Sequence, residues 1–135
     1  MGEYPKSVEG IGVKFVTSSS DLAKARLRFP CGCIADLTAS RISEKAERKM
    51  RIFQSGLYLS LDYSSGQARK LKIDSSGIPD PEKLHPEVVQ LEKEDALMAE
   101  IKSFLEAIQK KTLPLVTAED GLNAMRVAWQ IKDQL

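Results

Sequence analysis

The sequence predicts an α+β fold, in which helices from the C-terminal part of the chain pack on one face of an open antiparallel sheet. Apolar and polar residues alternate over most of residues 7–74, and glycine-containing turns divide this stretch into separate runs. After residue 95 the apolar residues recur every three or four positions, as they do along one side of a helix. We therefore expect about six strands, mostly in meander order, followed by helices.

The length of 135 residues is that of a single domain, which we expect to span 1–135. Within it we expect the sheet at about 7–74, a polar surface loop at 75–87 and a helical tail at about 95–134. The stretch "EVVQLE" after His85-Pro86 fits either a short edge strand or the approach to the first helix.

The composition excludes several classes of function. Hydrophobic residues make up 42% of the chain and charged residues 29%, which is typical of a soluble globular protein. The net charge of +1 gives no overall field that would attract nucleic acid or an anionic membrane. No apolar run approaches the roughly 20 residues of a membrane span, and the N-terminus has no signal-peptide hydrophobic region. We expect a cytoplasmic protein with neither nucleic-acid nor membrane partners.

The first hairpin is predicted from the turn Pro30-Cys31-Gly32. Proline suits the second position of a type I turn, and glycine suits the left-handed position that closes a three-residue loop. This loop places Ala25 opposite Leu37 and Arg26 opposite Asp36, so that apolar residues share one face and charged residues the other.

The second hairpin is predicted from Ser55-Gly56. A two-residue loop places Ile52 opposite Leu59 and Lys49 opposite Asp62.

The third hairpin is predicted from Ser64-Ser65-Gly66, which suits three residues with glycine last. That loop would place Leu59 opposite Leu71 and Leu57 opposite Ile73.

The earlier run "SVEGIGVKFV" predicts one more strand, with Ile11, Val13 and Phe15 on one face. Its two glycines indicate either close packing or a bulge.

Two helices are predicted after the sheet. Asp95 is a candidate cap for the first, and Pro114 breaks the pattern between them. Thr117 and Asp120 resemble a capping box for the second helix, which the apolar pattern carries to Ile131.

The sequence offers no recognisable catalytic, cofactor-binding or metal-ligating set. Cys31 and Cys33 flank a turn glycine without a second cysteine pair, so we expect a turn residue and a small core residue. His85, the single histidine, precedes Pro86 and is expected in a surface loop or at a helix start. No glycine-rich phosphate-binding motif follows a strand and opens a helix.

One face of the predicted sheet is charged, with an aromatic island where Phe53 lies opposite Tyr58. Its basic residues are Lys24, Arg26, Arg28, Lys49, Arg51, Lys70 and Lys72. Three interpretations stay open for this face: a solvated surface with weak ion pairs, a protein–protein contact and a basic groove for an anion. The candidate interface residues are Arg26, Asp36, Lys49, Arg51, Phe53, Tyr58, Ser60 and Asp62.

Two long stretches carry a resemblance to a known family. They are "ARLRFPCGCIADLTASRISEKAERKMRIFQSGLYLSLDY" and the tail "EIKSFLEAIQKKTLPLVTAEDGLNAMRVAWQI". The first resembles the sheet and the second the closing helices, with their "EDG" start, of the C-terminal domain of the Gfo/Idh/MocA oxidoreductases. The resemblance runs from about Val8 to Ile131. Within the family, the sequence most resembles the members that act on nucleotide-linked amino sugars.

The resemblance implies a substrate-side and oligomerisation domain of an NAD(P)-dependent sugar-type oxidoreductase. The family's Rossmann domain, Glu-Lys-Pro motif and early histidine helix have no counterpart here, so we expect a truncated or re-initiated start. We expect no catalytic residue, no bound cofactor and no activity of this chain alone, while NAD or NADP is implied for a full-length homologue.

The resemblance also bears on partners. It implies a homo-oligomer, dimer or higher, through the open sheet face, and a Rossmann domain in the full-length protein. It places Arg41, after "LTAS", towards the substrate end of the sheet. The alternative is a free-standing α+β interaction module that uses the same face for an unrelated partner.

Overall fold

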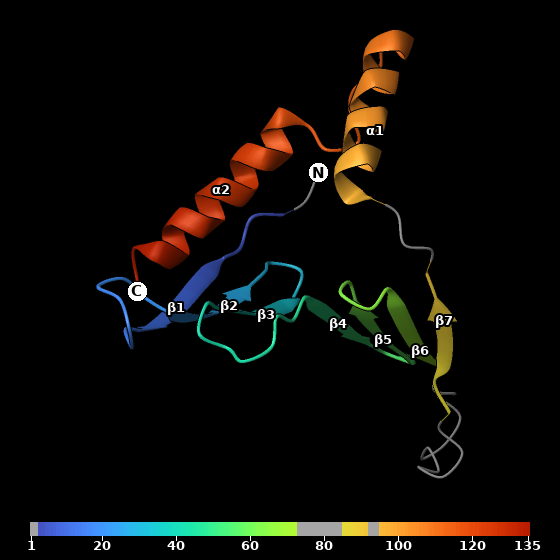
Figure 1. The fold of residues 1–135 in the computed structure, drawn as a ribbon. Helices are drawn as coiled ribbons and strands as arrows, with labels where there is room; N and C mark the ends of the chain where they lie inside the picture. The colour runs from blue at the N-terminus through green and yellow to red at the C-terminus, as the bar shows by residue number, and fades with distance from the viewer. Residues whose placement is uncertain (1–2, 73–84, 92–94) are drawn as a thin grey trace. The chain divides into compact units, whose positions relative to one another are not determined.

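The computed structural model describes residues 3–72, 85–91 and 95–135. Figure 1 shows the order of the elements. The chain forms two compact units: the first unit comprises Met1–Glu44 with Ile101–Leu135, and the second comprises Lys45–Glu100. Both contain antiparallel strands and the helices follow them in sequence, which confirms the α+β class.

The first unit contains a three-stranded antiparallel sheet in the order β1-β2-β3. Its strands are β1 (Ser7–Val13), β2 (Leu22–Arg28) and β3 (Ile34–Ser40). Ala25 pairs with Leu37 and Arg26 with Asp36, as the three-residue loop predicts. Gly32 has a φ of 86°, the left-handed conformation that closes such a loop.

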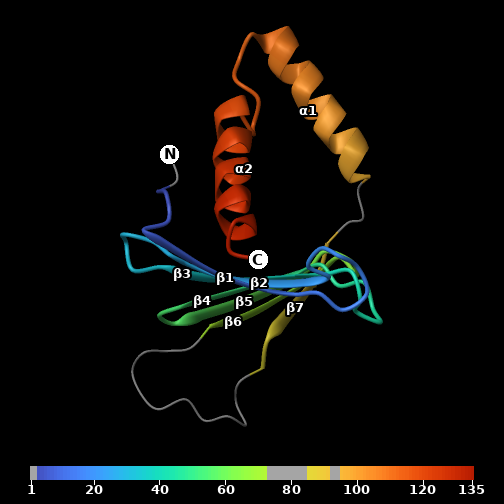
Figure 2. The same ribbon diagram turned by 90° about the vertical axis from the view of Figure 1, so that its left-hand side faces the viewer.

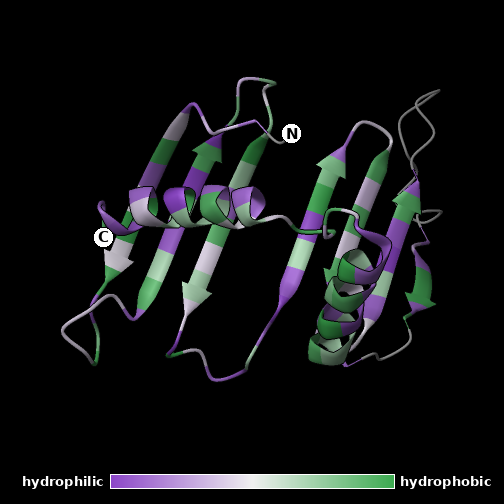
Figure 3. Ribbon diagram, turned by 90° about the horizontal axis from the view of Figure 1, so that it is seen from above, coloured by the Kyte–Doolittle hydropathy of each residue, from purple (hydrophilic) through white to green (hydrophobic). Residues whose placement is uncertain are grey.

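The two faces of this sheet differ sharply in exposure. Ala25 and Leu27 are 7% and 5% exposed, whereas the alternating residues Lys24, Arg26 and Arg28 are open to solvent. Figure 3 shows the corresponding alternation of hydrophilic and hydrophobic residues along the strands. The core of the first unit therefore lies on the Ala25–Leu27 face.

Helix α2 (Ala118–Lys132) lies on one side of this sheet with its C-terminal end nearest to β1 (Figures 1 and 2). The approach depends on glycine, because a Cβ at Gly10 would stand 3.3 Å from the Ile131 carbonyl oxygen. A Cβ at Gly12 would stand 3.0 Å from Leu135 Cβ. The expected close packing at these glycines is confirmed.

The remaining residues of β1 correct one expectation. Ile11 and Val13 do share a face, but it is the exposed one, opposite Lys24 and Leu22. Phe15 lies beyond the end of the strand and is 76% exposed. The glycines occupy the helix-facing positions, and the larger apolar residues therefore fall on the other side.

The second unit contains a four-stranded antiparallel sheet in the order β4-β5-β6-β7. Its strands are β4 (Lys49–Gln54), β5 (Leu57–Asp62), β6 (Gln67–Lys72) and β7 (Glu87–Gln90). Ile52 pairs with Leu59 and Lys49 with Asp62, as the two-residue loop predicts. The ambiguous stretch after Pro86 is an edge strand, so the described residues form seven strands in two sheets rather than about six in one.

The third hairpin has a register one residue away from the predicted one. Leu59 pairs with Lys70 and Leu57 with Lys72, and Ile73 lies outside the described residues. The loop has four residues, because Asp62 pairs with Gln67. The Asp62 carboxylate accepts hydrogen bonds from the backbone N–H groups of the two serines that follow Tyr63, which holds the longer turn closed.

This slip moves residues between faces. Because directly paired residues share a face, Lys70 and Lys72 lie with Leu57 and Leu59 rather than on the charged face. Leu71 moves the other way and pairs with Tyr58. The prediction was wrong for both lysines, and the aromatic island gains an apolar neighbour.

The helix boundaries follow the predicted caps. Asp95 accepts hydrogen bonds from the N–H groups of Leu97 and Met98 at the start of α1 (Ala96–Lys110). Thr117 and Asp120 form the capping box of α2. Neither helix is long and apolar enough to cross a membrane.

Candidate functional site

The open face of the first sheet carries a charged row. Arg26 donates from Nε and Nη2 to the two carboxylate oxygens of Asp36, at 2.7 and 2.8 Å. The hydrogen bond from Arg26 lowers the pKa of Asp36 below its usual value. Both side chains are about half exposed or more, which makes the pair a solvated one and limits its contribution to stability.

The open face of the second sheet carries the other six candidate interface residues. The register places them in three directly opposed pairs, Lys49 with Asp62, Arg51 with Ser60 and Phe53 with Tyr58. The structure thus brings these six side chains onto one face; whether a partner covers them stays a prediction.

An apolar patch lies within this face and consists of Phe53, Tyr58 and Leu71, here called the aromatic patch. The two rings lie with their centroids 4.8 Å apart and their planes tilted by 35°. Phe53 is 75% exposed although it is one of the largest apolar side chains of the chain. Such an exposed cluster, surrounded by charge, has the anatomy of a protein–protein contact.

The charged side chains beside the aromatic patch interact with residues close to them in sequence. Lys49 Nζ lies 2.7 Å from Glu47 Oε1 rather than on Asp62, its cross-strand partner. Hydrogen bonds from the backbone of Ser65 and Ser64 lower the pKa of Asp62. Asp62 is therefore ionised at neutral pH, and its carboxylate already accepts hydrogen bonds within its own turn.

Arg41 directly follows β3 and lies against Asp21 at the start of β2. Its N–H donates to the Asp21 carbonyl oxygen at 3.0 Å, and its Nε lies 3.8 Å from Asp21 Oδ1. The Arg41 side chain is 59% exposed. It can therefore reach an anion in solution without leaving its carboxylate neighbour. Its assignment to a substrate stays a prediction.

Asp21 is the most buried polar side chain described, at 1% exposure, and sequence reasoning missed it. Its Oδ2 accepts hydrogen bonds from the N–H groups of Phe15, Val16 and Thr17 at 2.7–2.9 Å. Thr17 Oγ1 donates to Oδ1 at 2.8 Å. These bonds, led by the one from the Thr17 backbone N–H, lower the pKa of Asp21 far below its usual value. The signal was an aspartate that follows four small polar residues just before a strand.

The cysteines correct another expectation. Cys31 and Cys33 are both exposed free thiols, so Cys33 is not a core residue. His85 is exposed in the segment before β7. Across residues 3–72, 85–91 and 95–135, no three His, Cys, Asp or Glu side chains come together as metal ligands would.

The described residues contain no Rossmann-type turn for a nicotinamide dinucleotide. A dinucleotide site places a glycine-rich turn between a strand and a helix, with the pyrophosphate at the helix N-terminus. The positive-φ glycines here, Gly32, Gly56 and Gly66, all lie in hairpin turns between strands. Neither described helix starts directly after a strand, since each begins at a capped residue of a linker.

Comparisons with known proteins identify relatives of part of a dehydrogenase. The chain is 32% identical over 131 residues to a UDP-N-acetylglucosamine 3-dehydrogenase of Acidithiobacillus ferrooxidans, covering 97% of this chain and 42% of that protein. A solved structure of that dehydrogenase matches with a TM-score of 0.88 at 30% identity, over 98% of this chain and 41% of the other. No protein-family model matches the sequence.

More distant structures share the fold. A levoglucosan dehydrogenase in complex with NADH and levoglucosan matches with a TM-score of 0.79 at 14% identity, over 98% of this chain and 43% of the other. An aldose-aldose oxidoreductase from Caulobacter crescentus matches with a TM-score of 0.75 at 18% identity, over 98% of this chain and 39% of the other.

The matches confirm the resemblance to the C-terminal domain of the Gfo/Idh/MocA type. The chain is homologous to part of a UDP-N-acetylglucosamine 3-dehydrogenase. It spans 42% of the length of this curated relative.

Proposed function

We propose that the chain is the substrate-side and oligomer-forming part of an NAD(P)-dependent oxidoreductase that acts on a nucleotide-linked sugar, and that it does not catalyse by itself. The observation that carries this proposal is the match to the dehydrogenase over 97% of the chain, with a TM-score of 0.88 for its structure. Hydride transfer needs a bound nicotinamide, and the described residues contain no Rossmann-type turn for one.

The partner in this proposal is a second copy of the chain, bound through the aromatic patch. Phe53 stands 75% exposed beside Tyr58 and Leu71, on a face whose rim is charged. Burial of large aromatic side chains at the centre of a contact supplies much of the binding energy, and a charged rim supplies specificity.

The test of the interface is a double substitution, Phe53→Asp with Tyr58→Asp. We expect the purified chain to lose its oligomer while its circular dichroism spectrum stays unchanged. The matched control is Leu113→Asp, at an exposed apolar position (83% exposed) in the linker between the helices. An unfolded double variant would show that both rings are core residues and would contradict the face assignment.

The test of the catalytic part of the proposal is NADH titration of the purified chain, followed by fluorescence. We expect no saturable binding in the micromolar range typical of such sites. Saturable binding would show a dinucleotide site and overturn the claim of an inactive part. A stable complex with an unrelated protein, together with a monomeric chain, would instead favour a free-standing interaction module.

For Arg41 we propose contact with an anionic group of the substrate. An exposed guanidinium whose Nε lies 3.8 Å from Asp21 Oδ1 has donors available for a phosphate. In a protein with the relative's full length, Arg41→Ala should raise the KM for the nucleotide sugar more than Arg41→Lys does, at little cost to kcat. Equal KM values for the unaltered protein and both variants would show that Arg41 does not contact the substrate.

A further inference from the structure

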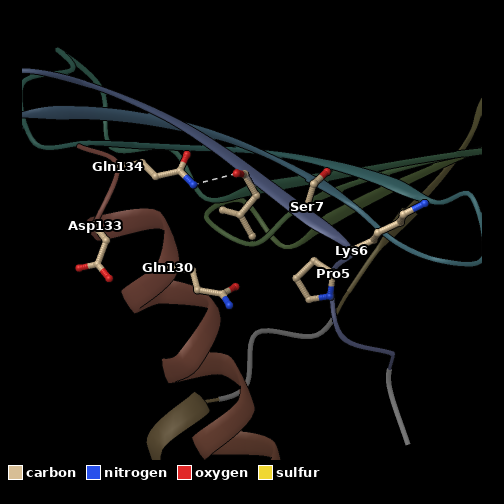
Figure 4. A pocket seen from close by; sticks show the side chains of 7 residues that line it. Pro5, Lys6, Ser7, Gln130, Asp133 and Gln134 are labelled. Atoms are coloured by element: carbon tan, nitrogen blue, oxygen red, sulfur yellow. Dashed lines mark hydrogen bonds between the residues drawn. The ribbon is translucent and has the colours of Figure 1, made fainter.

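Strand β1 is an edge strand, and part of its free edge is occupied by a side chain. Among residues 3–72, 85–91 and 95–135, the sheet order β1-β2-β3 leaves one side of β1 without a strand neighbour. On that side Gly10 donates its N–H to Gln134 Oε1 at 2.7 Å. Gln134 Nε2 in turn donates to the Val8 carbonyl oxygen at 2.8 Å, the bond drawn in Figure 4. One carboxamide thus satisfies a donor and an acceptor two residues apart.

These two backbone groups are the ones that a neighbouring strand would use. In a sheet, the carbonyl of one residue and the N–H two residues later point to the same side and pair with the next strand. Gln134 comes from the turn after α2, where its own N–H donates to the Ile131 carbonyl oxygen at 3.0 Å. The helix end therefore takes the place of a strand at the centre of the edge.

The sequence around β1 is adapted to the same task. Lys6 and Lys14 flank the strand, and lysines at the ends of an edge strand discourage pairing with another chain. Gly10 lacks a Cβ, which would stand 3.3 Å from Gln134 Cβ, so the carboxamide can come close to the backbone.

We propose that Gln134 guards the β1 edge, and that without its carboxamide this edge pairs with β1 of a second copy of the chain. The backbone N–H and carbonyl groups that point to the free edge belong to Val8, Gly10 and Gly12. Because Gly10 is the middle one of the three, two copies pair antiparallel about that residue. Glu9 of one copy then lies opposite Ile11 of the other, while Lys6 of one copy lies opposite Lys14 of the other just beyond the strand ends. This surface is the edge of the first sheet and is separate from the aromatic patch.

The test is Gln134→Ala with Gln130→Ala as the matched control, since Gln130 lies one helical turn earlier and lines the same pocket (Figure 4). Both are placed in the Phe53→Asp, Tyr58→Asp background, which removes association through the aromatic patch. Light scattering over a concentration series should show self-association at least roughly tenfold tighter for Gln134→Ala than for Gln130→Ala. Equal masses at every concentration, with native circular dichroism, would overturn the proposal.

A charge pair at position 11 tests the register of the new contact. Ile11 is 71% exposed, so Ile11→Lys and Ile11→Glu are both tolerated by the fold. Added to Gln134→Ala, the lysine lies opposite Glu9 of the other copy and strengthens association, whereas the glutamate weakens it. The opposite order, or no difference, would contradict pairing through β1.

A measurement on the unaltered chain covers the case in which Gln134→Ala does not fold. Hydrogen exchange at the Gly10 amide should be slow, because Gln134 holds it. Exchange as fast as in exposed loops would show that the guard is open in solution and would overturn the proposal. This readout does not depend on the aromatic patch, so its failure is distinct from failure of the proposed oligomer.

Discussion

The two sheets of this chain are built from similar hairpins but differ in what lies against them. The first sheet has α2 beside it, and Ala25 and Leu27 are buried to 7% and 5% exposure. Among the described residues of the second unit no side chain is buried to this degree, and every residue of β5 is half-buried. Alternation along a strand therefore predicts a face, whereas a core also requires a covering element.

This difference has a consequence for function. The second sheet offers apolar groups on both of its faces, Leu57 and Leu59 on one and the aromatic patch on the other. A sheet with little buried area of its own gains stability when a partner covers it. The proposed oligomer contact lies on the second sheet, whose side chains are less buried than those of the first sheet.

The largest expected effect separates the two sheets by a core substitution. Leu27→Ala should lower the free energy of unfolding by about 2–5 kcal/mol through a cavity on the buried face of the first sheet. Leu59→Ala, at a half-buried position, should cost only about 1–2 kcal/mol. Urea denaturation of both variants measures the difference between these two losses in the free energy of unfolding. Equal costs would show that the Leu59 face is covered in solution.

The next effect concerns Asp21 and its pH dependence. Hydrogen bonds from the loop lower the pKa of Asp21, so its stabilising contribution is present above the usual value near 4 and is lost as the pH falls through the native pKa. Asp21→Asn should therefore lower the Tm at pH 7, and its difference from the unaltered chain should shrink in acid. A Tm difference that grows as the pH falls would contradict this assignment.

A smaller effect tests the four-residue turn of the second sheet. Gly66 has a φ of 68°, so Gly66→Ala should cost about 1–2 kcal/mol in strain. The control is Gly121→Ala in α2, where a Cβ meets nothing within 4 Å and alanine should stabilise by up to about 1 kcal/mol. Thermal melts of both variants give the signs. A neutral Gly66→Ala would argue against the assigned turn.

The smallest effect is expected on the open face of the first sheet. Arg26→Ala and Asp36→Ala should each change the Tm only slightly, because the pair is exposed and screened by salt. High salt should bring the coupling between the two substitutions, which is the effect of the double variant minus the sum of the two single effects, close to zero. A large, salt-independent coupling would show that this face is shielded from solvent.

Much of the fold was predictable because glycine turns determine register. Gly32 and Gly56 adopt positive φ, and both of their hairpins have the predicted pairs. The third register was wrong because the Asp62 side chain, which the alternation pattern ignores, lengthens the turn. The prediction of a single sheet was also wrong, because the alternation pattern does not show where hydrogen-bonded pairing between strands ends.

The candidate site was only partly predictable. The register placed Phe53 against Tyr58 and Arg26 against Asp36, because both pairs are local in sequence. Asp21 and Gln134 were missed for different reasons. The contacts of Asp21 depend on the conformation of a loop, whereas Gln134 meets β1 across 124 residues of chain, and periodicity carries no information about either.

The most direct test of the central claim is the solution mass of the purified chain by light scattering, over a concentration series at two salt levels. The proposed function predicts a dimer or larger assembly that Phe53→Asp with Tyr58→Asp dissociates. A monomer at every concentration and both salt levels would return the aromatic patch to solvent and contradict the oligomer-forming role.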